Sequence, residues 1–136
     1  MGYTYNGHPT ACAVAMANLD IIENEGLLAK AKDTGDYLLR RLGPLTELSV
    51  VGEVRGVGMM LAIELVTDEK SRAPLLPTPP VEDVARHETG VIVRNCGHSV
   101  VLSPPLSMTR DEADELADAL TSVLRRLRPD ATWASA

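Results

Sequence analysis

The lysines are the side chains of this sequence that could form a covalent bond to a substrate or cofactor carbonyl. They are Lys30, Lys32 and Lys70. Such chemistry needs an amine whose surroundings lower its pKa. Lys30 and Lys32 lie on the polar face of a helical pattern, and Lys70 lies in a charged loop. These are polar surroundings, and the three residues are the candidates for any lysine chemistry in this chain.

A second group with possible chemistry comprises His8, Cys12, Cys96 and His98, whose types could bind a metal ion. The two cysteines lie far apart and lack the paired spacing of zinc sites or of secreted disulfide frameworks. Free cysteine is also a common buried residue. We therefore predict reduced thiols and no metal site.

Apolar periodicity predicts the elements that position these residues. A helix from Pro9 to about Glu25 begins with a suitable proline and ends at Gly26. Its first half is apolar nearly all round, which predicts burial by a larger protein or a partner subunit. The further predictions are a helix over 27–42, strands beginning at 50 and over 59–66, a helix over 81–88, strands over 91–94 and 100–102, and a helix after Thr109, where Glu112 completes a capping box.

The order of these elements predicts an α+β fold, with helices on one face of a small, mainly antiparallel sheet in two layers. Gly56 and Gly58 lie between the first two strands without a following helix, so we interpret them as turn or bulge glycines rather than a phosphate loop. The segment 67–80 contains four prolines and no periodicity, which indicates a long functional or mobile loop.

Composition narrows the possible functions. The chain has 136 residues, 45% of them apolar, and a formal net charge of -6. A negative field disfavours nucleic acid and anionic lipid as partners. No apolar run is long enough to cross a bilayer, and the first residues lack the features of a signal peptide. We expect a soluble, cytoplasmic protein.

Five segments carry recognisable motifs. The sequence Thr4-Tyr5-Asn6-Gly7-His8-Pro9 runs straight into an alanine-rich helix. It is followed in order by 51–58 (VGEVRGVG), 64–66 (ELV) and 90–94 (GVIVR), the last ahead of 102–106 (LSPPL). Together they resemble class III pyridoxal-phosphate aminotransferases, with Asn6 where the family more often has serine. The segment 94–105 is most similar to the ω-amino acid or amine:pyruvate transaminases.

The resemblance covers the chain to about Pro129 and implies the C-terminal part of a fold-type I enzyme. Members of that family are homodimers that bind pyridoxal phosphate on a large domain, with active sites at the subunit interface. By this resemblance, residues 1–25 end the large domain and form a connecting helix, 26–130 form the small domain, and 131–136 form a frayed tail.

Two residues match functional positions of the family. Thr4 matches the threonine that hydrogen-bonds the cofactor phosphate of the neighbouring subunit. Arg94 matches the arginine that binds a substrate carboxylate, and a planar guanidinium suits that role. Without the resemblance, Thr4 would be interpreted as a turn residue and Arg94 as a solvated or ion-paired arginine at a strand end. Arg55, between two strands, is interpreted as structural.

The resemblance also indicates what is missing. The family lysine that forms a Schiff base with the cofactor should precede Thr4, and no lysine here lies in such a motif. We therefore expect an inactive piece of an enzyme that transfers an amino group from an amine or ω-amino acid to a keto acid such as pyruvate. Two alternatives remain: a stand-alone α+β domain that binds a partner or an anion, and part of an aminomutase or epimerase of the same fold.

Overall fold

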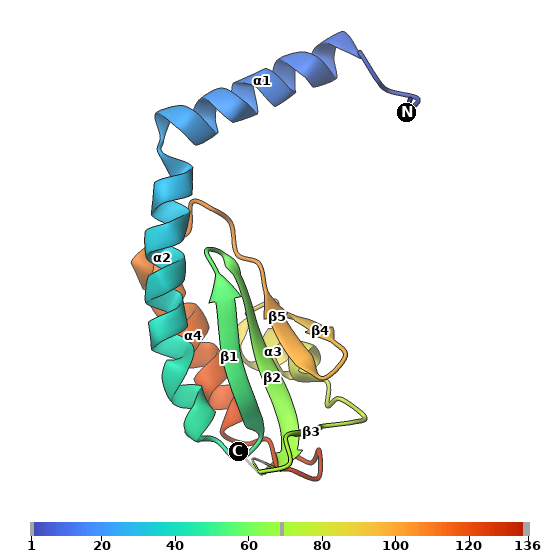
Figure 1. The fold of residues 1–136 in the computed structure, drawn as a ribbon, viewed down its shortest axis with the longest axis vertical. Helices are drawn as coiled ribbons and strands as arrows, with labels where there is room; N and C mark the ends of the chain where they lie inside the picture. The colour runs from blue at the N-terminus through green and yellow to red at the C-terminus, as the bar shows by residue number, and fades with distance from the viewer. Residues whose placement is uncertain (1, 69, 135–136) are drawn as a thin grey trace.

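The structure, a computed structural model, describes residues 2–68 and 70–134. A helix, α1 (Pro9–Asn24), projects from a body built of one sheet and three helices (Figure 1). No residue of α1 is buried, and the large side chains Val14 and Met16 are 64% and 59% exposed. The predicted helix is confirmed, and its apolar surface has no cover within the described chain.

The body begins at the junction between α1 and α2 (Leu27–Leu42). Gly26 has a φ of 62°, in the left-handed region that glycine tolerates best, and this residue separates the two helices. From Leu27 onward the apolar positions of α2 turn inward, with Leu38 and Leu42 fully buried. Their helical spacing is what the sequence predicts, and the core of the molecule starts here.

The sheet is antiparallel throughout, with the strand order β1-β2-β5-β4 and a short β3 on the outer part of β2. In β2, Leu61, Ile63 and Leu65 are buried and alternate with less buried residues. This alternation directs one face of the sheet toward the helices. The strands are β1 (Val51–Val57), β2 (Met60–Asp68), β3 (Ala73–Pro74), β4 (Arg94–Cys96) and β5 (Ser99–Leu102).

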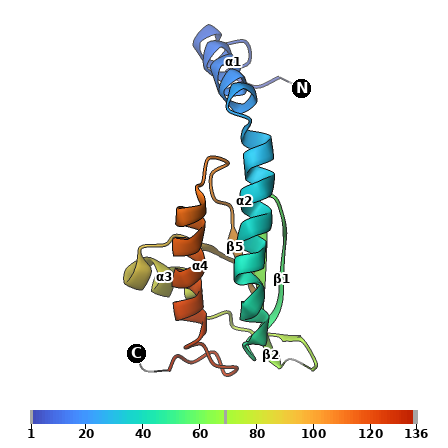
Figure 2. The same ribbon diagram turned by 90° about the vertical axis from the view of Figure 1, so that its left-hand side faces the viewer.

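Helices α2 and α4 (Arg110–Leu124) pack side by side against that face, and α3 (Val81–Thr89) packs against α4 (Figure 2). The capping box of Thr109 and Glu112 starts α4, as predicted. The apolar face of α4, including Leu120 and Leu124, is fully buried in one core with β2 and α2. The predicted two-layer α+β fold is confirmed, and no helix of the described chain is long and apolar enough to span a membrane.

Three local predictions differ from the structure. The strand predicted over 91–94 instead comprises Arg94–Cys96, because its partner β5 ends at Leu102, shortly before two prolines that lack N–H donors. The segment 67–80 is partly ordered by β3 and by the buried side chain of Leu75. Of the tail predicted to fray, Trp133 forms a β-bridge with Leu127, whereas residues 135 and 136 lie outside the described chain.

A close backbone contact fixes the sheet against α2. A Cβ atom on Gly35, in α2, would lie 2.1 Å from the carbonyl oxygen of Gly58. Gly58 has a φ of 55° and forms the turn between β1 and β2 together with Met59. Helix and turn can approach so closely only because Gly35 has no side chain.

We therefore expect Gly35→Ala to lower the free energy of unfolding by about 2–3 kcal/mol, because backbone must move to admit the methyl group. Urea unfolding of the purified chain measures this. Asp36→Ala places an alanine at the next position of α2 and removes only an exposed ion pair, so it should change stability by about 0.5 kcal/mol or less. A Gly35→Ala variant as stable as the wild type would contradict the contact.

Candidate functional site

The face of the sheet opposite the helices is open, and it carries the predicted arginine. Register places Arg94 opposite Val101, Val101 opposite Ala62, and Ala62 opposite Arg55. These four side chains form one row across β4, β5, β2 and β1, on the side of the sheet away from the core. The row has a small apolar centre and an arginine at each end.

The two arginines of the row differ in their partners. Nη1 of Arg55 lies 3.0 Å from Glu53 Oε2 and 3.9 Å from Glu64 Oε2. Arg94 is exposed and has no side-chain hydrogen bond or ion pair within the described residues. An exposed guanidinium without a protein partner keeps its donors available for a carboxylate.

Next to Arg55 and Ala62, the open face has a shallow apolar depression. Val57 and Met60, which face each other at the β1–β2 turn, are among the most exposed large apolar side chains of the chain. They line the depression together with Val101 and the row residues beside them. The depression reaches Val101, the β5 neighbour of Arg94, although Arg94 does not itself line it.

A hydrogen-bonded network of polar side chains lies at the other end of the open face. Its centre is Glu64, whose side chain is only 19% exposed. Arg72 Nη2 donates to Glu64 Oε2 at 2.7 Å, and His98 Nε2 lies 3.2 Å from Glu64 Oε1. The hydrogen bond from Arg72 is the largest cause that lowers the pKa of Glu64, and the bond to His98 acts in the same direction. Glu64 therefore stays ionised and holds the network together.

Sequence reasoning missed this network. Alternation with Leu61, Ile63 and Leu65 could have placed Glu64 on the open face. The position of Arg72 depends on the turn between β2 and β3, where Asp68 accepts backbone hydrogen bonds from Lys70 and Ser71 and where Arg72 has a φ of 51°. That left-handed conformation of a non-glycine residue has no signature in the sequence.

Thr4 lies in a turn just before α1. Asn6 N donates to Tyr3 O, Gly7 has a φ of 73°, and the ring of His8 accepts from Ala11 N as the N-cap of α1. The Thr4 hydroxyl is exposed and has no partner within the described residues. A free hydroxyl beside a helix N-terminus fits an anion such as a phosphate. Helix α1 and the segment before it, which carries Thr4, lie clear of the sheet, so this chain does not bring Thr4 into contact with Arg94 (Figure 1).

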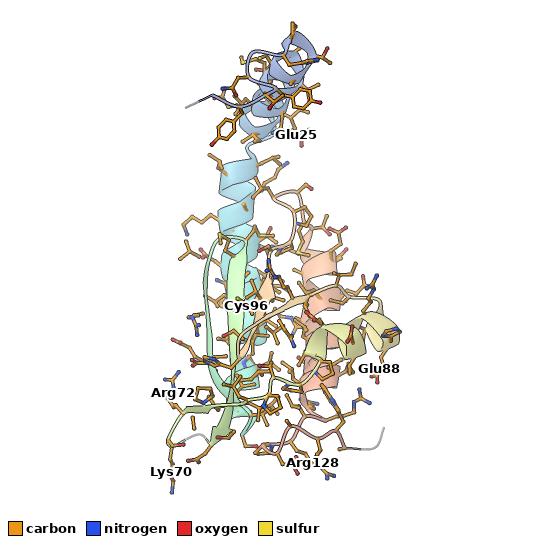
Figure 3. The ribbon with its side chains drawn as sticks, turned by 90° about the vertical axis from the view of Figure 1, so that its right-hand side faces the viewer. Glu25, Lys70, Arg72, Glu88, Cys96 and Arg128 are labelled. Atoms are coloured by element: carbon orange, nitrogen blue, oxygen red, sulfur yellow. The ribbon has the colours of Figure 1, made fainter. Side chains whose placement is uncertain are left out.

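The remaining residues considered from the sequence lie at the surface. Lys32 pairs with Asp36 at 2.6 Å, and this hydrogen bond raises the pKa of the lysine, which opposes nucleophilic use. Lys70 lies near Arg72, at the end of the sheet remote from α1 (Figure 3). Cys12 and Cys96 are exposed free thiols, and residues 2–68 and 70–134 contain no cluster of three or more potential metal ligands.

Comparison with known proteins identifies related sequences. The family model described as "Aminotransferase class-III" matches residues 1–124. Diaminobutyrate–2-oxoglutarate transaminase of Halomonas elongata is 44% identical over an alignment of 121 residues that covers 85% of this chain and 26% of that protein. Putrescine–pyruvate aminotransferase of Pseudomonas aeruginosa is 39% identical over 118 residues, again 85% of this chain and 26% of the relative.

Solved structures agree in fold. An amine transaminase from an uncultivated Pseudomonas species, in its PLP-bound form, is 48% identical, with a TM-score of 0.85 over 93% of this chain and 29% of that one. An (S)-enantioselective omega-transaminase from Thermomicrobium roseum is 42% identical, with a TM-score of 0.85 over 92% of this chain and 29% of that one. The chain thus spans between a quarter and a third of the length of these relatives.

The lowered pKa of Glu64 predicts a dependence of stability on pH. Because the folded-state pKa lies below the unfolded one, ionised Glu64 stabilises the fold above its ordinary pKa, and this contribution is lost as the pH falls through the lowered pKa. Glu64→Gln should be about 1–2 kcal/mol less stable than the wild type at pH 7. This difference should shrink as the pH is lowered to about 3.

Denaturant unfolding at a series of pH values measures this effect. Glu115→Gln is a matched control, because Glu115 is an exposed glutamate with no ion pair within the described chain. Its stability should follow that of the wild type at every pH. A constant difference between Glu64→Gln and the wild type from pH 7 to pH 3 would show that the charge of Glu64 does not stabilise the fold.

Proposed function

Because the chain belongs to the class III aminotransferase family, we propose that it forms the C-terminal part of an enzyme that transfers an amino group from an amine or an ω-amino acid to a keto acid such as pyruvate. The observation that carries the proposal is the free guanidinium of Arg94 at the end of an apolar row on the open face of the sheet. Arginine beside small apolar groups suits a small substrate with a carboxylate.

In this proposal Arg94 binds the carboxylate of the keto acid through two parallel hydrogen bonds. Arg55 is a poorer candidate for this role, because its guanidinium already forms ion pairs with Glu53 and Glu64. The apolar surface around Val101 and Val57 excludes water from the neutral part of the substrate. An amine that lacks a carboxylate makes no use of Arg94.

Thr4 donates a hydrogen bond to the phosphate of pyridoxal phosphate, which fits its free hydroxyl and the adjacent N-terminus of α1. When bound, this cofactor supplies an electron sink for the carbanion that forms at the substrate carbon. Since α1 carries Thr4 away from the sheet, the threonine and Arg94 of one chain serve different sites. This arrangement supports a homodimer in which Thr4 reaches the site of the neighbouring subunit.

Residues 1–25 belong to the large domain and the connecting helix, and 26–130 form the small domain. The absence of buried residues in α1 and the start of the core at Leu27 support this division. Lys30 is exposed on α2, Lys32 is held by Asp36, and Lys70 lies remote from α1. The proposal therefore requires the catalytic lysine to come from residues outside this chain.

The role of Thr4 can be tested in the aminotransferase of which this chain forms the C-terminal part, called here the complete enzyme. Thr4→Val should raise the Kd for pyridoxal phosphate about tenfold, the effect of one lost hydrogen bond to a charged group. Titration of the apoenzyme, followed by the absorbance of bound cofactor, measures this.

Thr10→Val, also exposed and in the first turn of α1, is the matched control and should leave the Kd unchanged. The 136-residue chain alone should form no borohydride-stable adduct with the cofactor. An adduct on one of its own lysines would contradict the proposal and identify the chain as an enzyme by itself.

The proposed role of Arg94 predicts that its removal weakens the binding of substrates with a carboxylate and of no others. In the complete enzyme, Arg94→Leu should raise the KM for pyruvate by about 10–100-fold, because a charge-assisted hydrogen bond contributes about 1.5–3 kcal/mol. The kinetic constants for an uncharged aldehyde acceptor should not change. Steady-state kinetics with both acceptors measures the effect, with Arg86→Leu, an exposed arginine on α3, as control. An equal loss of kcat/KM with pyruvate and with the aldehyde would show that Arg94 does not bind the substrate carboxylate.

A further inference from the structure

The strand that carries Arg94 has little support from the sheet. β4 has three residues, lies at the edge, and within the described residues pairs only with β5. The outer side of an edge strand has backbone groups without strand partners. A side chain that must hold a substrate in one orientation needs a fixed backbone beneath it. Residues outside the sheet therefore have to hold the outer side of β4.

Residues 78–82 provide that support. The backbone N–H of Asn95 donates to the carboxylate of Glu82 at 2.8 Å, and Asn95 Nδ2 donates to the carbonyl of Pro79 at 2.8 Å. Thr78 Oγ1 donates to the carbonyl of Gly97, in the turn after β4, at 2.6 Å. Three hydrogen bonds thus take the place of a neighbouring strand along β4.

The element that carries Glu82 is itself well anchored. Val81 and Ala85 of α3 are fully buried in the core. Glu88, near the other end of α3, forms an ion pair with Arg126, which follows α4. Figure 3 shows Glu88 on α3, to one side of the strand region marked by Cys96. A carboxylate on such a helix can hold the β4 backbone in a defined place.

Alternate side chains along β4 point to opposite sides of the strand, so the side chain that faces a substrate differs from the one that anchors the strand. Arg94 and Cys96 are exposed, whereas Asn95 between them points to the opposite side and is half-buried. The Oδ1 atom of Asn95 is buried without a partner in the described chain, which destabilises a fold. An apolar residue of similar size would avoid that loss, so the hydrogen bond from Nδ2 is the feature that asparagine adds.

We propose that Asn95 and Glu82 are positioning residues for Arg94: they fix the outer side of β4 to α3 and to the segment just before it, and so set the orientation in which the guanidinium meets a substrate carboxylate. This inference rests on the proposed function of Arg94. Neither residue contacts the substrate. Without them, β4 keeps its pairing with β5 and the hydrogen bond from Thr78 to the turn that follows, but its outer side is released and Arg94 samples more orientations. Affinity for a carboxylate then falls, while reactions of substrates that lack one proceed as before.

Kinetics of the complete enzyme tests the proposal. Asn95→Leu and Glu82→Ala should each raise the KM for pyruvate about tenfold, the loss expected from a slightly misplaced binding group. The kinetic constants for an uncharged aldehyde should stay unchanged. Glu82→Gln keeps an acceptor oxygen for the Asn95 N–H and should restore most of the affinity for pyruvate. Asp83→Ala, an exposed neighbour on α3, is the matched control.

A second measurement does not depend on catalysis. In the 136-residue chain, hydrogen exchange of the Asn95 amide should be faster in Glu82→Ala than in the wild type or in Glu82→Gln. This measurement decides the matter if Asn95→Leu fails to fold. Unchanged exchange, or equal losses with both acceptors, overturns the proposal.

The Arg94→Leu variant distinguishes a failure of the positioning role from a failure of the proposed function. If it loses affinity for pyruvate but Asn95→Leu and Glu82→Ala do not, the positioning role is wrong and the proposed function stands. If Arg94→Leu itself has no selective effect, the proposed function fails and the positioning role fails with it.

Discussion

The contact between α2 and the β1–β2 turn is the constraint on which the rest of the structure depends. Gly35 and Gly58 bring two backbones together where a single methyl group would not fit. This contact sets the distance between the helical layer and the sheet, and so lets Leu38 and Ile63 pack in one core. With that face closed, alternation along the strands leaves Glu64, Ala62 and Arg94 on the open side, where the candidate site lies.

Periodicity in the sequence was enough to predict the helices and a small, mainly antiparallel sheet, because local side-chain patterns encode them. The close contact at Gly35 could not be predicted, since glycine in a helix has no local explanation and its partner lies 23 residues further along the chain. The bounds of β4 were misplaced for a similar reason: they depend on where β5 ends, which is a property of the pairing rather than of residues 91–94.

In the candidate site, too, some features follow from the local sequence and others from contacts between residues far apart in the chain. The motif around Arg94 identifies this arginine as a candidate. That it has no ion pair follows only from the folded sheet, where Arg55 pairs with Glu53 and Arg72 pairs with Glu64. Charged residues far apart in sequence decide which arginine remains available. Neither composition nor spacing distinguishes a paired guanidinium from a free one, because the partners meet only in the folded sheet.

The topology of the sheet also bears on the order in which the molecule assembles. β2 meets β1 through a tight turn, whereas β5, which also pairs with β2, follows only after β3, α3 and β4. Contacts between distant segments require closure of a longer chain loop, which costs more conformational entropy. We therefore expect the α2–β1–β2 unit to form early, and the strand with Arg94 to be among the last parts to join and the first to open.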